Sequence, residues 1–253
     1  MDPLLDFSSK VAVITGAAQG FGKLLAQALA QRGAKLVISD INEAGVQQVA
    51  DDIAATGAEV FALKCDVSNK ADCKAMVDAA IEHFGAVDIG VNNAGVAHDF
   101  TALHEIDEAL MDSQFAINVK GVQFGMSFQI EQMLKQQGGA ILNVSSMAGL
   151  GGAAKIGAYS MAKHAVIGLT KTAAVEYGGA NIRINAICPF FTLTQMVTDM
   201  ADDSMQAKMS LAVPMARLGE AQEIVAMMLM MLSPQNTYMT GQCIAIDGGV
   251  SAR

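Results

Sequence analysis

The chain has 253 residues, of which 52% are hydrophobic and only 16% are charged, and its formal net charge is −9. A chain of this length can bury a complete core, and α/β domains of this size commonly stay undivided, so we expect one domain over residues 1–253. The acidic balance would repel phosphates and argues against nucleic-acid binding or a basic membrane-contacting patch, which leaves small molecules as the expected partners. The high apolar content favours a homo-oligomer that buries part of its surface.

Targeting and metal-binding patterns are absent from the sequence. Residues 1–10 contain Asp2 and Asp6 but no apolar run, so we expect neither a signal nor a transit peptide, and no stretch reaches the length of a membrane span. The cysteines (positions 65, 73, 188 and 243) and the histidines (positions 83, 98, 104 and 164) show no metal-ligand or redox spacing. We therefore expect a protein of the reducing cytoplasm that holds no metal.

Short β-branched runs alternate with helical patterns along the whole chain. They predict strands over residues 11–15, 36–39, 60–63, 87–91, 140–144, 182–187 and 243–246, and helices over residues 22–31, 43–55, 70–84, 106–137, 157–178 and 221–232. The strands read as nearly continuous apolar runs, which is typical of a parallel sheet covered by helices on both faces. Right-handed crossovers then give a doubly wound α/β (Rossmann) fold with a mostly parallel, seven-stranded sheet.

The segment over residues 190–213 departs from this alternation. It carries methionines at positions 196, 200, 205 and 209 ahead of Pro214. Two interpretations stay open: a substrate lid, or a surface helix whose methionines face the core.

The first strand runs into a glycine-rich turn, Thr15-Gly16-Ala17-Ala18-Gln19-Gly20-Phe21-Gly22. Glycines let backbone amides approach a pyrophosphate, because a side chain would hold the backbone away, and the N-terminus of the next helix adds partial positive charge. The turn therefore predicts a dinucleotide site.

Asp40 ends the second strand, 24 residues beyond Gly16. A carboxylate there can accept hydrogen bonds from the adenosine ribose hydroxyls and would repel the extra phosphate of NADP, so we expect NAD(H) as the cofactor. Two alternatives stay open: Asp40 only starts the following loop, or Lys23 and Lys35 admit NADP.

Two more motifs follow, Asn92-Asn93-Ala94-Gly95 after the fourth strand and Tyr159-Ser160-Met161-Ala162-Lys163 in a helix. With the TGxxxGxG spacing of the glycine turn and with Asn118 between them, the chain resembles the short-chain dehydrogenase/reductase family over essentially its whole length. The resemblance implies a catalytic group of Asn118, Ser146, Tyr159 and Lys163.

Tyr159 and Lys163 are four residues apart and therefore share one face of a helix. A phenol titrates near pH ~10, and a neighbouring ammonium stabilises its anion, which suits an acid/base group that works nearer neutrality. In ketone reduction the nicotinamide would deliver hydride to the carbonyl carbon while Tyr159 protonates the oxygen, and alcohol oxidation would run in reverse. The alternative is a packed tyrosine with a lysine that extends to water.

Ser145 and Ser146 end the fifth strand, where alternation points their side chains to opposite faces. In the family the catalytic serine lies thirteen residues before the tyrosine, which selects Ser146 to polarise the carbonyl, while Ser145 packs or supports. The resemblance further implies that Asn118 keeps a local helix irregularity and a water near Lys163, on a proton path from Tyr159 to solvent.

The remaining cofactor contacts are implied by the resemblance. With Tyr159 and Lys163, they comprise the glycine turn, the strand ends and the chain after the sixth strand, namely Gly16, Gln19, Gly20, Phe21, Gly22, Asp40, Ile41, Asp66, Val67, Asn92, Ala94, Gly95, Pro189, Thr192 and Thr194. Asp66 and Val67 would lie near adenine, and Thr194 would hold the carboxamide. The family usually has Pro-Gly after the sixth strand, whereas this chain has Pro189-Phe190, so close backbone approach must be achieved without glycine.

The expected substrate side is apolar and has no evident cation. Besides Ser146 and Tyr159 it comprises Met147, Phe190, Phe191 and Met196, with Leu150 and Met200 nearby. We therefore expect a hydrophobic, uncharged secondary alcohol or ketone as substrate, although the same residues would suit core or subunit interface. The alternatives are an acyl-thioester (3-oxoacyl) reductase and a catalytically silent NAD-binding scaffold. The C-terminal turn Asp247-Gly248-Gly249 resembles the family's pairing edge, which favours a homotetramer.

Overall fold

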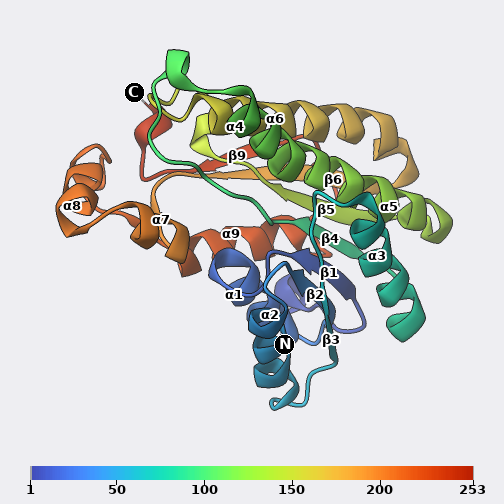
Figure 1. The fold of residues 1–253 in the computed structure, drawn as a ribbon. Helices are drawn as coiled ribbons and strands as arrows, with labels where there is room; N and C mark the ends of the chain where they lie inside the picture. Colours follow the sequence, from blue (N-terminus) through green and yellow to red (C-terminus); the bar gives the residue numbers. More distant parts are fainter. Residues whose placement is uncertain (1, 253) are drawn as a thin grey trace.

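The computed structural model describes residues 2–252, without the side chains of Met196 and Met200. Its main sheet has seven parallel strands in the order β3-β2-β1-β4-β5-β6-β9, which confirms the expected fold class (Figure 1). The strands are β1 (Val11–Thr15), β2 (Lys35–Asp40), β3 (Val60–Lys64), β4 (Ile89–Asn92), β5 (Gly139–Val144), β6 (Ile182–Pro189) and β9 (Cys243–Ile246). The fourth strand thus starts and ends later than its apolar pattern predicts.

Helices cover both faces of this sheet (Figure 1). One face carries α1 (Gly20–Ala30), α2 (Glu43–Ala54) and α9 (Ala221–Leu232); the other carries α3 (Lys70–Phe84), α5 (Gly121–Gln136) and α6 (Gly157–Tyr177). Along β1 the side chains alternate between the two cores, with Ala12 and Ile14 in the first and Val11 and Val13 in the second. Both faces of the strand are buried, which explains its continuous apolar run. Within residues 2–252, none of the helices is both long and apolar enough to cross a membrane.

The helix predicted over residues 106–137 is not uniform. It consists of α4 (Glu108–Phe115), a π-helical turn (Ala116–Lys120) and α5, which follow one another without a break. It begins at Glu108 because the Asp107 carboxylate caps it, accepting a hydrogen bond from the Leu110 amide at 2.8 Å. The predicted helix therefore starts two residues later than expected and is interrupted by a π-turn around Asn118.

The strand order reverses between β1 and β4, so the crossovers leave these two strands in opposite directions across the sheet. In open parallel sheets, ligands bind in the crevice beyond the carboxyl ends of the strands at such a reversal. The glycine turn, Asp40, Asn92, Ser146 and Pro189 all lie at these carboxyl ends.

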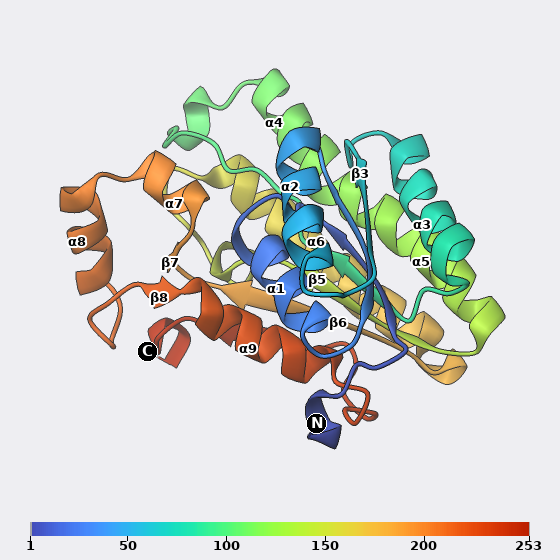
Figure 2. The ribbon, with the colours of Figure 1, turned by 90° about the horizontal axis from the view of Figure 1, so that it is seen from below.

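The segment after β6 forms a small unit of its own. It contains β7 (Thr192–Leu193), which pairs with β8 (Gly219–Glu220), and the helices α7 (Gln195–Met200) and α8 (Asp203–Leu211). No residue of α8 is buried, and both views show α8 at the periphery (Figures 1 and 2). The interpretation that the methionines face the core is therefore wrong for Met205 and Met209. The side chains of Met196 and Met200 lie outside the described part, and the lid stays a prediction.

Candidate active site

The glycine turn is shaped by its own packing. Gly16 has a φ of +67°, and a Cβ there would lie 2.8 Å from the Cα of Ala94; a Cβ on Gly22 would press on the carbonyl oxygen of Gly16. Gln19 is the N-cap of α1 but makes no capping hydrogen bond with its side chain. The first amides of α1 therefore face the carboxyl edge without a side-chain partner at the cap, which fits a phosphate group.

Asn93 clamps this turn to the end of β4. Its side-chain amide donates to the carbonyls of Thr15 and Gly16, each at 2.9 Å, and the Thr15 hydroxyl accepts from the amides of Asn93 (3.0 Å) and Ala94 (3.1 Å). These four bonds join segments 77 to 79 residues apart. Because the two segments approach so closely, there is no space for a side chain at Gly16 or Gly22.

The side chain of Asn92, a predicted cofactor contact, points away from this edge. It is buried and exchanges hydrogen bonds with Gln129, both at 3.1 Å, and donates to Asn143 at 2.9 Å. Its polar atoms are thus committed to a cluster between the sheet and α5. A cofactor contact by Asn92 would have to come from its backbone.

Asp40 lies at the mouth of the glycine turn. Its carboxylate accepts from the amides of Ala18 and Asn42, each at 3.0 Å, and Ile41 beside it is 63% exposed. A carboxylate has about four lone-pair positions, so two acceptor positions remain for ribose hydroxyls. Lys35 lies at the other end of β2, where it pairs with Glu59 at 3.0 Å.

Asp66 and Val67 shape the loop after β3. The Asp66 carboxylate accepts from the amide and the hydroxyl of Ser68 at 2.9 and 2.7 Å. Val67 is buried against Gly121, where a Cβ would lie 2.8 Å from a Val67 methyl group. These internal contacts therefore hold the loop in place at the carboxyl edge of the sheet, where Asp40 also lies.

The proposed acid/base group assembles between β5 and α6. The Lys163 ammonium is buried, donates to the Val144 carbonyl at 2.9 Å and lies 5.5 Å from the centroid of the Tyr159 ring. Ser146 lies near the Tyr159 phenol and lowers its pKa through hydrogen bonding. Ser145 turns the other way and donates to the Lys163 carbonyl at 2.9 Å, so it supports the helix, as its place in the strand predicts.

Asn118 sits within the π-turn and ties it to the loop after β4. Its side chain accepts from the Val96 amide at 2.9 Å and donates to the Val96 carbonyl at 2.8 Å and to Gln114 at 2.7 Å. A Cβ on Gly95 would lie 2.7 Å from the Asn118 side-chain oxygen and 3.3 Å from the Lys163 ammonium. The helix irregularity expected at Asn118 is thus present, and it lies next to Lys163.

Burial dominates the electrostatics of this group. It raises the pKa of the Tyr159 phenol above 10.0, and the hydrogen bond with Ser146 opposes that rise. It lowers the pKa of Lys163 from 10.5 to about 8, against an opposing contribution from Cys188. The Tyr159 phenol is therefore held in its protonated form, and Lys163 can exchange a proton near neutrality.

The chain beyond β6 carries the residues predicted to form the apolar side of the site. The rings of Phe190 and Phe191 lie 4.3 Å apart between centroids and line a small cavity of about 100 Å³. The Thr192 hydroxyl donates to the Phe190 carbonyl at 2.8 Å, whereas Thr194 stands at the N-cap of α7 without capping it. Met147, in the turn after Ser146, is half-buried, and the side chain of Met196 lies outside the described residues.

A cation that the sequence did not reveal also lines this cavity. Arg217 makes a bidentate pair with Glu223, with distances of 2.6 and 2.7 Å. The pair holds the pKa of Glu223 near 2, chiefly through the hydrogen bond with Arg217, so both partners stay charged over the working range of pH. The charge of Arg217 is thus neutralised in place.

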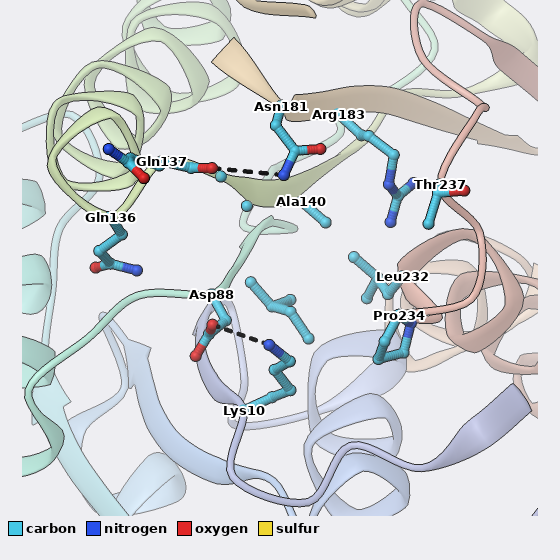
Figure 3. Close-up of a pocket in the computed structure, with 13 residues that line it drawn as sticks. Lys10, Asp88, Gln136, Gln137, Ala140, Asn181, Arg183, Leu232, Pro234 and Thr237 are labelled. Atoms are coloured by element: carbon cyan, nitrogen blue, oxygen red, sulfur yellow. Dashed lines mark hydrogen bonds and ion pairs between the residues drawn. The ribbon is translucent and has the colours of Figure 1, made fainter. Parts of the chain in front are cut away.

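A larger cavity, of about 340 Å³, lies at the opposite edge of the sheet (Figure 3). Lys10, which pairs with Asp88 at 3.3 Å, precedes β1, and Asn181 precedes β6, so these residues mark the amino ends of the strands. Arg183 beside them donates to the carbonyl of Met231 at the end of α9. None of the predicted site residues whose side chains the structure describes lines this cavity. Within the described chain, no three His, Cys, Asp or Glu residues gather into a possible metal site.

Known proteins are similar to this chain over nearly its whole length. A family model described as enoyl-(acyl carrier protein) reductase matches residues 16–251. Cyclohexanol dehydrogenase of Acinetobacter sp. (strain SE19) is 36% identical over 247 residues, which cover 98% of this chain and 97% of that protein. The chain belongs to the short-chain dehydrogenase/reductase family.

Two solved structures of this family extend the comparison. Levodione reductase has a TM-score of 0.92 at 35% identity, over 97% of this chain and 99% of that one. The 3-ketoacyl-(acyl-carrier-protein) reductase from Brucella melitensis, complexed with NADH, has a TM-score of 0.91 at 33% identity, over 97% of this chain and all of that one.

In this short-chain dehydrogenase/reductase, the structure brings Asn118, Ser146, Tyr159 and Lys163 to one place beside the glycine turn. Sequence reasoning missed three residues that shape the site: Asn93, Arg217 and His98, whose imidazole contacts the Tyr159 amide. Asn93 could have been found from its place inside the NNAG motif. His98 and Arg217 carry no such sequence signal. The partner of His98 is 61 residues away, and neither Arg217 nor its partner Glu223 belongs to a motif.

Proposed function

We propose that this protein is an NAD(H)-dependent oxidoreductase that interconverts a hydrophobic, uncharged secondary alcohol and its ketone. The observation that carries the proposal is the meeting of Ser146, Tyr159 and Lys163 beside the glycine turn. Because Ser146 acts on the pKa of the Tyr159 phenol, the two hydroxyls lie near one another, and one substrate oxygen can contact both of them.

The residues present fit a nicotinamide dinucleotide. The uncapped amides of α1 suit its pyrophosphate, the Asp40 carboxylate suits a ribose diol, and the Thr194 hydroxyl suits the carboxamide. When bound, this cofactor supplies or accepts the hydride. Asp40 favours NAD(H), since a second negative charge at the 2′ position would face its carboxylate.

Side chains of the protein itself carry out the proton transfer. In ketone reduction the Tyr159 hydroxyl gives its proton to the carbonyl oxygen, while the Ser146 hydroxyl donates a hydrogen bond to the same oxygen. The protonated phenol that burial favours is the form this direction needs. In alcohol oxidation the Tyr159 phenolate takes the proton back, and the neighbouring Lys163 ammonium stabilises that anion.

The substrate side favours an uncharged molecule. Phe190 and Phe191 supply apolar contact area, and the Arg217 beside them is already neutralised by Glu223, so it offers little attraction to a carboxylate or phosphate. The similarity to proteins named for cyclohexanol and levodione supports a cyclic alcohol or ketone.

A substrate panel tests the proposal. Alicyclic and aromatic ketones are compared with acidic ketones and 3-oxoacyl thioesters, each with NADH and with NADPH. We expect the highest kcat/KM for an alicyclic ketone with NADH. Tyr159→Phe should keep NADH binding and lose turnover by about 10²-fold or more, because it removes the acid/base group. The matched control, Tyr238→Phe, changes a fully exposed tyrosine and should leave turnover unchanged.

Other outcomes of the panel decide against the proposal. Faster turnover of the thioesters would favour a 3-oxoacyl reductase, the second candidate, which the similarity to the Brucella melitensis reductase supports. A preference for NADPH would refute the role of Asp40. NADH binding without turnover of any ketone would favour a silent scaffold.

A further inference from the structure

His98 reaches from the loop after β4 to the helix that carries the acid/base pair. Its Nε2 atom lies 3.3 Å from the Tyr159 backbone nitrogen, and its Nδ1 atom lies 2.7 Å from the Asp99 carbonyl oxygen. A carbonyl can only accept, so Nδ1 carries the proton and Nε2 is left to accept from the Tyr159 amide. The imidazole is thus assigned as the neutral Nδ1–H tautomer.

The beginning of α6 lacks an ordinary cap. Its N-cap residue is Ile156, which has no side-chain acceptor, and Tyr159 is the third residue of the helix. The amide at this third position is one of those that a serine, threonine, aspartate or asparagine at the N-cap would satisfy. The His98 imidazole accepts from that amide instead, across 61 residues of sequence.

The loop that carries His98 is held at both of its ends. Val96 exchanges two hydrogen bonds with the Asn118 side chain, at 2.8 and 2.9 Å. The Thr101 amide donates to the Lys155 carbonyl at 2.8 Å, and Thr101 forms a bridge with Ile156 just before α6. His98 lies between these two attachments, so its position relative to α6 is fixed by the fold.

We propose that His98 is a positioning residue that caps α6 and thereby fixes the Tyr159 phenol against Ser146 and Lys163. This inference rests on the proposed role of Tyr159 as acid/base. The amide that His98 binds belongs to Tyr159 itself, so loss of the bond lets the first turn of α6 fray at the reacting residue. The glycine turn after β1 and Asp40 at the end of β2 lie outside α6, so we expect these cofactor contacts to keep their geometry when the bond is lost.

Three substitutions separate capping from general packing. His98→Leu removes the acceptor; His98→Gln can place its amide oxygen near the position of Nε2; His98→Asn is polar but too short to reach it. His104→Leu is the matched control, because it makes the same change at an exposed histidine whose side chain is 85% accessible.

Steady-state kinetics with the best ketone of the panel give the first readout. We expect His98→Leu and His98→Asn to lower kcat about tenfold, since a displaced reacting group costs rate steeply, while KM for NADH changes less than about twofold. His98→Gln should recover most of kcat, and His104→Leu should match the wild type. Unchanged kcat in His98→Asn, or a His98→Gln variant as slow as His98→Leu, would overturn the proposal.

Hydrogen exchange of the peptide covering residues 157–163 gives a second readout that needs no substrate. Loss of the cap should speed exchange there by about fivefold in His98→Leu and His98→Asn and leave His98→Gln near the wild type. Unchanged exchange would refute the cap whatever the reaction is. If the wild type turns over no ketone but the exchange rates change as expected, the proposed function fails and the cap stands.

Discussion

Replacing Lys163 by methionine tests the inference that burial governs the charge of this amine. Lys163 is 3% exposed, and burial lowers its pKa from 10.5 to about 8. Between these two values the unfolded chain binds more protons than the folded one, so the stability of the wild type rises with pH. Below pH 8 the Lys163 amine is charged in both the folded and the unfolded state, and the cost of burying this charge destabilises the fold in full. This cost is relieved as the pH rises through 8 towards 10.5, because the buried amine loses its proton.

The size of the effect follows from the same shift. One pKa unit corresponds to ~1.36 kcal/mol, and with the gradual onset of both titrations the wild type gains about 2.5 kcal/mol between pH 7 and pH 10. Methionine has a similar length and no charge, so Lys163→Met lacks this gain. The difference in free energy of unfolding, wild type minus variant, should therefore grow by about 2.5 kcal/mol from pH 7 to pH 10.

The assay is urea unfolding of the cofactor-free protein at pH 7, 8, 9 and 10. Lys208→Met, which changes an exposed lysine on α8, is the control, and its difference from the wild type should stay flat over this range. Parallel curves for the wild type and Lys163→Met would show that the buried amine does not titrate in this window, and the reasoning would be refuted.

Three further substitutions probe the cofactor and substrate sides. Gly22→Ala should lower thermal stability and weaken NADH binding measured by fluorescence, because the added methyl presses on the Gly16 carbonyl; unchanged values would contradict the packing described for the turn. Thr194→Val should raise KM for NADH about tenfold or less, the cost of one or two hydrogen bonds, with the unfolding midpoint unchanged; an unaltered KM would remove Thr194 from the site. Glu223→Gln should free the Arg217 charge and raise kcat/KM for acidic ketones relative to neutral ones, and an unchanged ratio would place Arg217 away from the substrate.

The sequence by itself determined the architecture and the shared helix face of Tyr159 and Lys163. Apolar runs and helical periods are properties of neighbouring residues, so the parallel sheet with helices on both faces could be predicted, as could the shared helix face of Tyr159 and Lys163. The glycine turn could likewise be recognised from the sequence, because its spacing lies within eight consecutive residues.

The tertiary structure decided which side chains face one another. It turned Asn92 into the core, inserted a π-turn at Asn118, and brought His98 to an amide 61 residues away. It also paired Arg217 with Glu223, which neutralises a charge at the predicted substrate side. The contacts of Asn92 and His98 depend on how strands and loops from distant parts of the chain are placed relative to one another, and no local pattern encodes that placement.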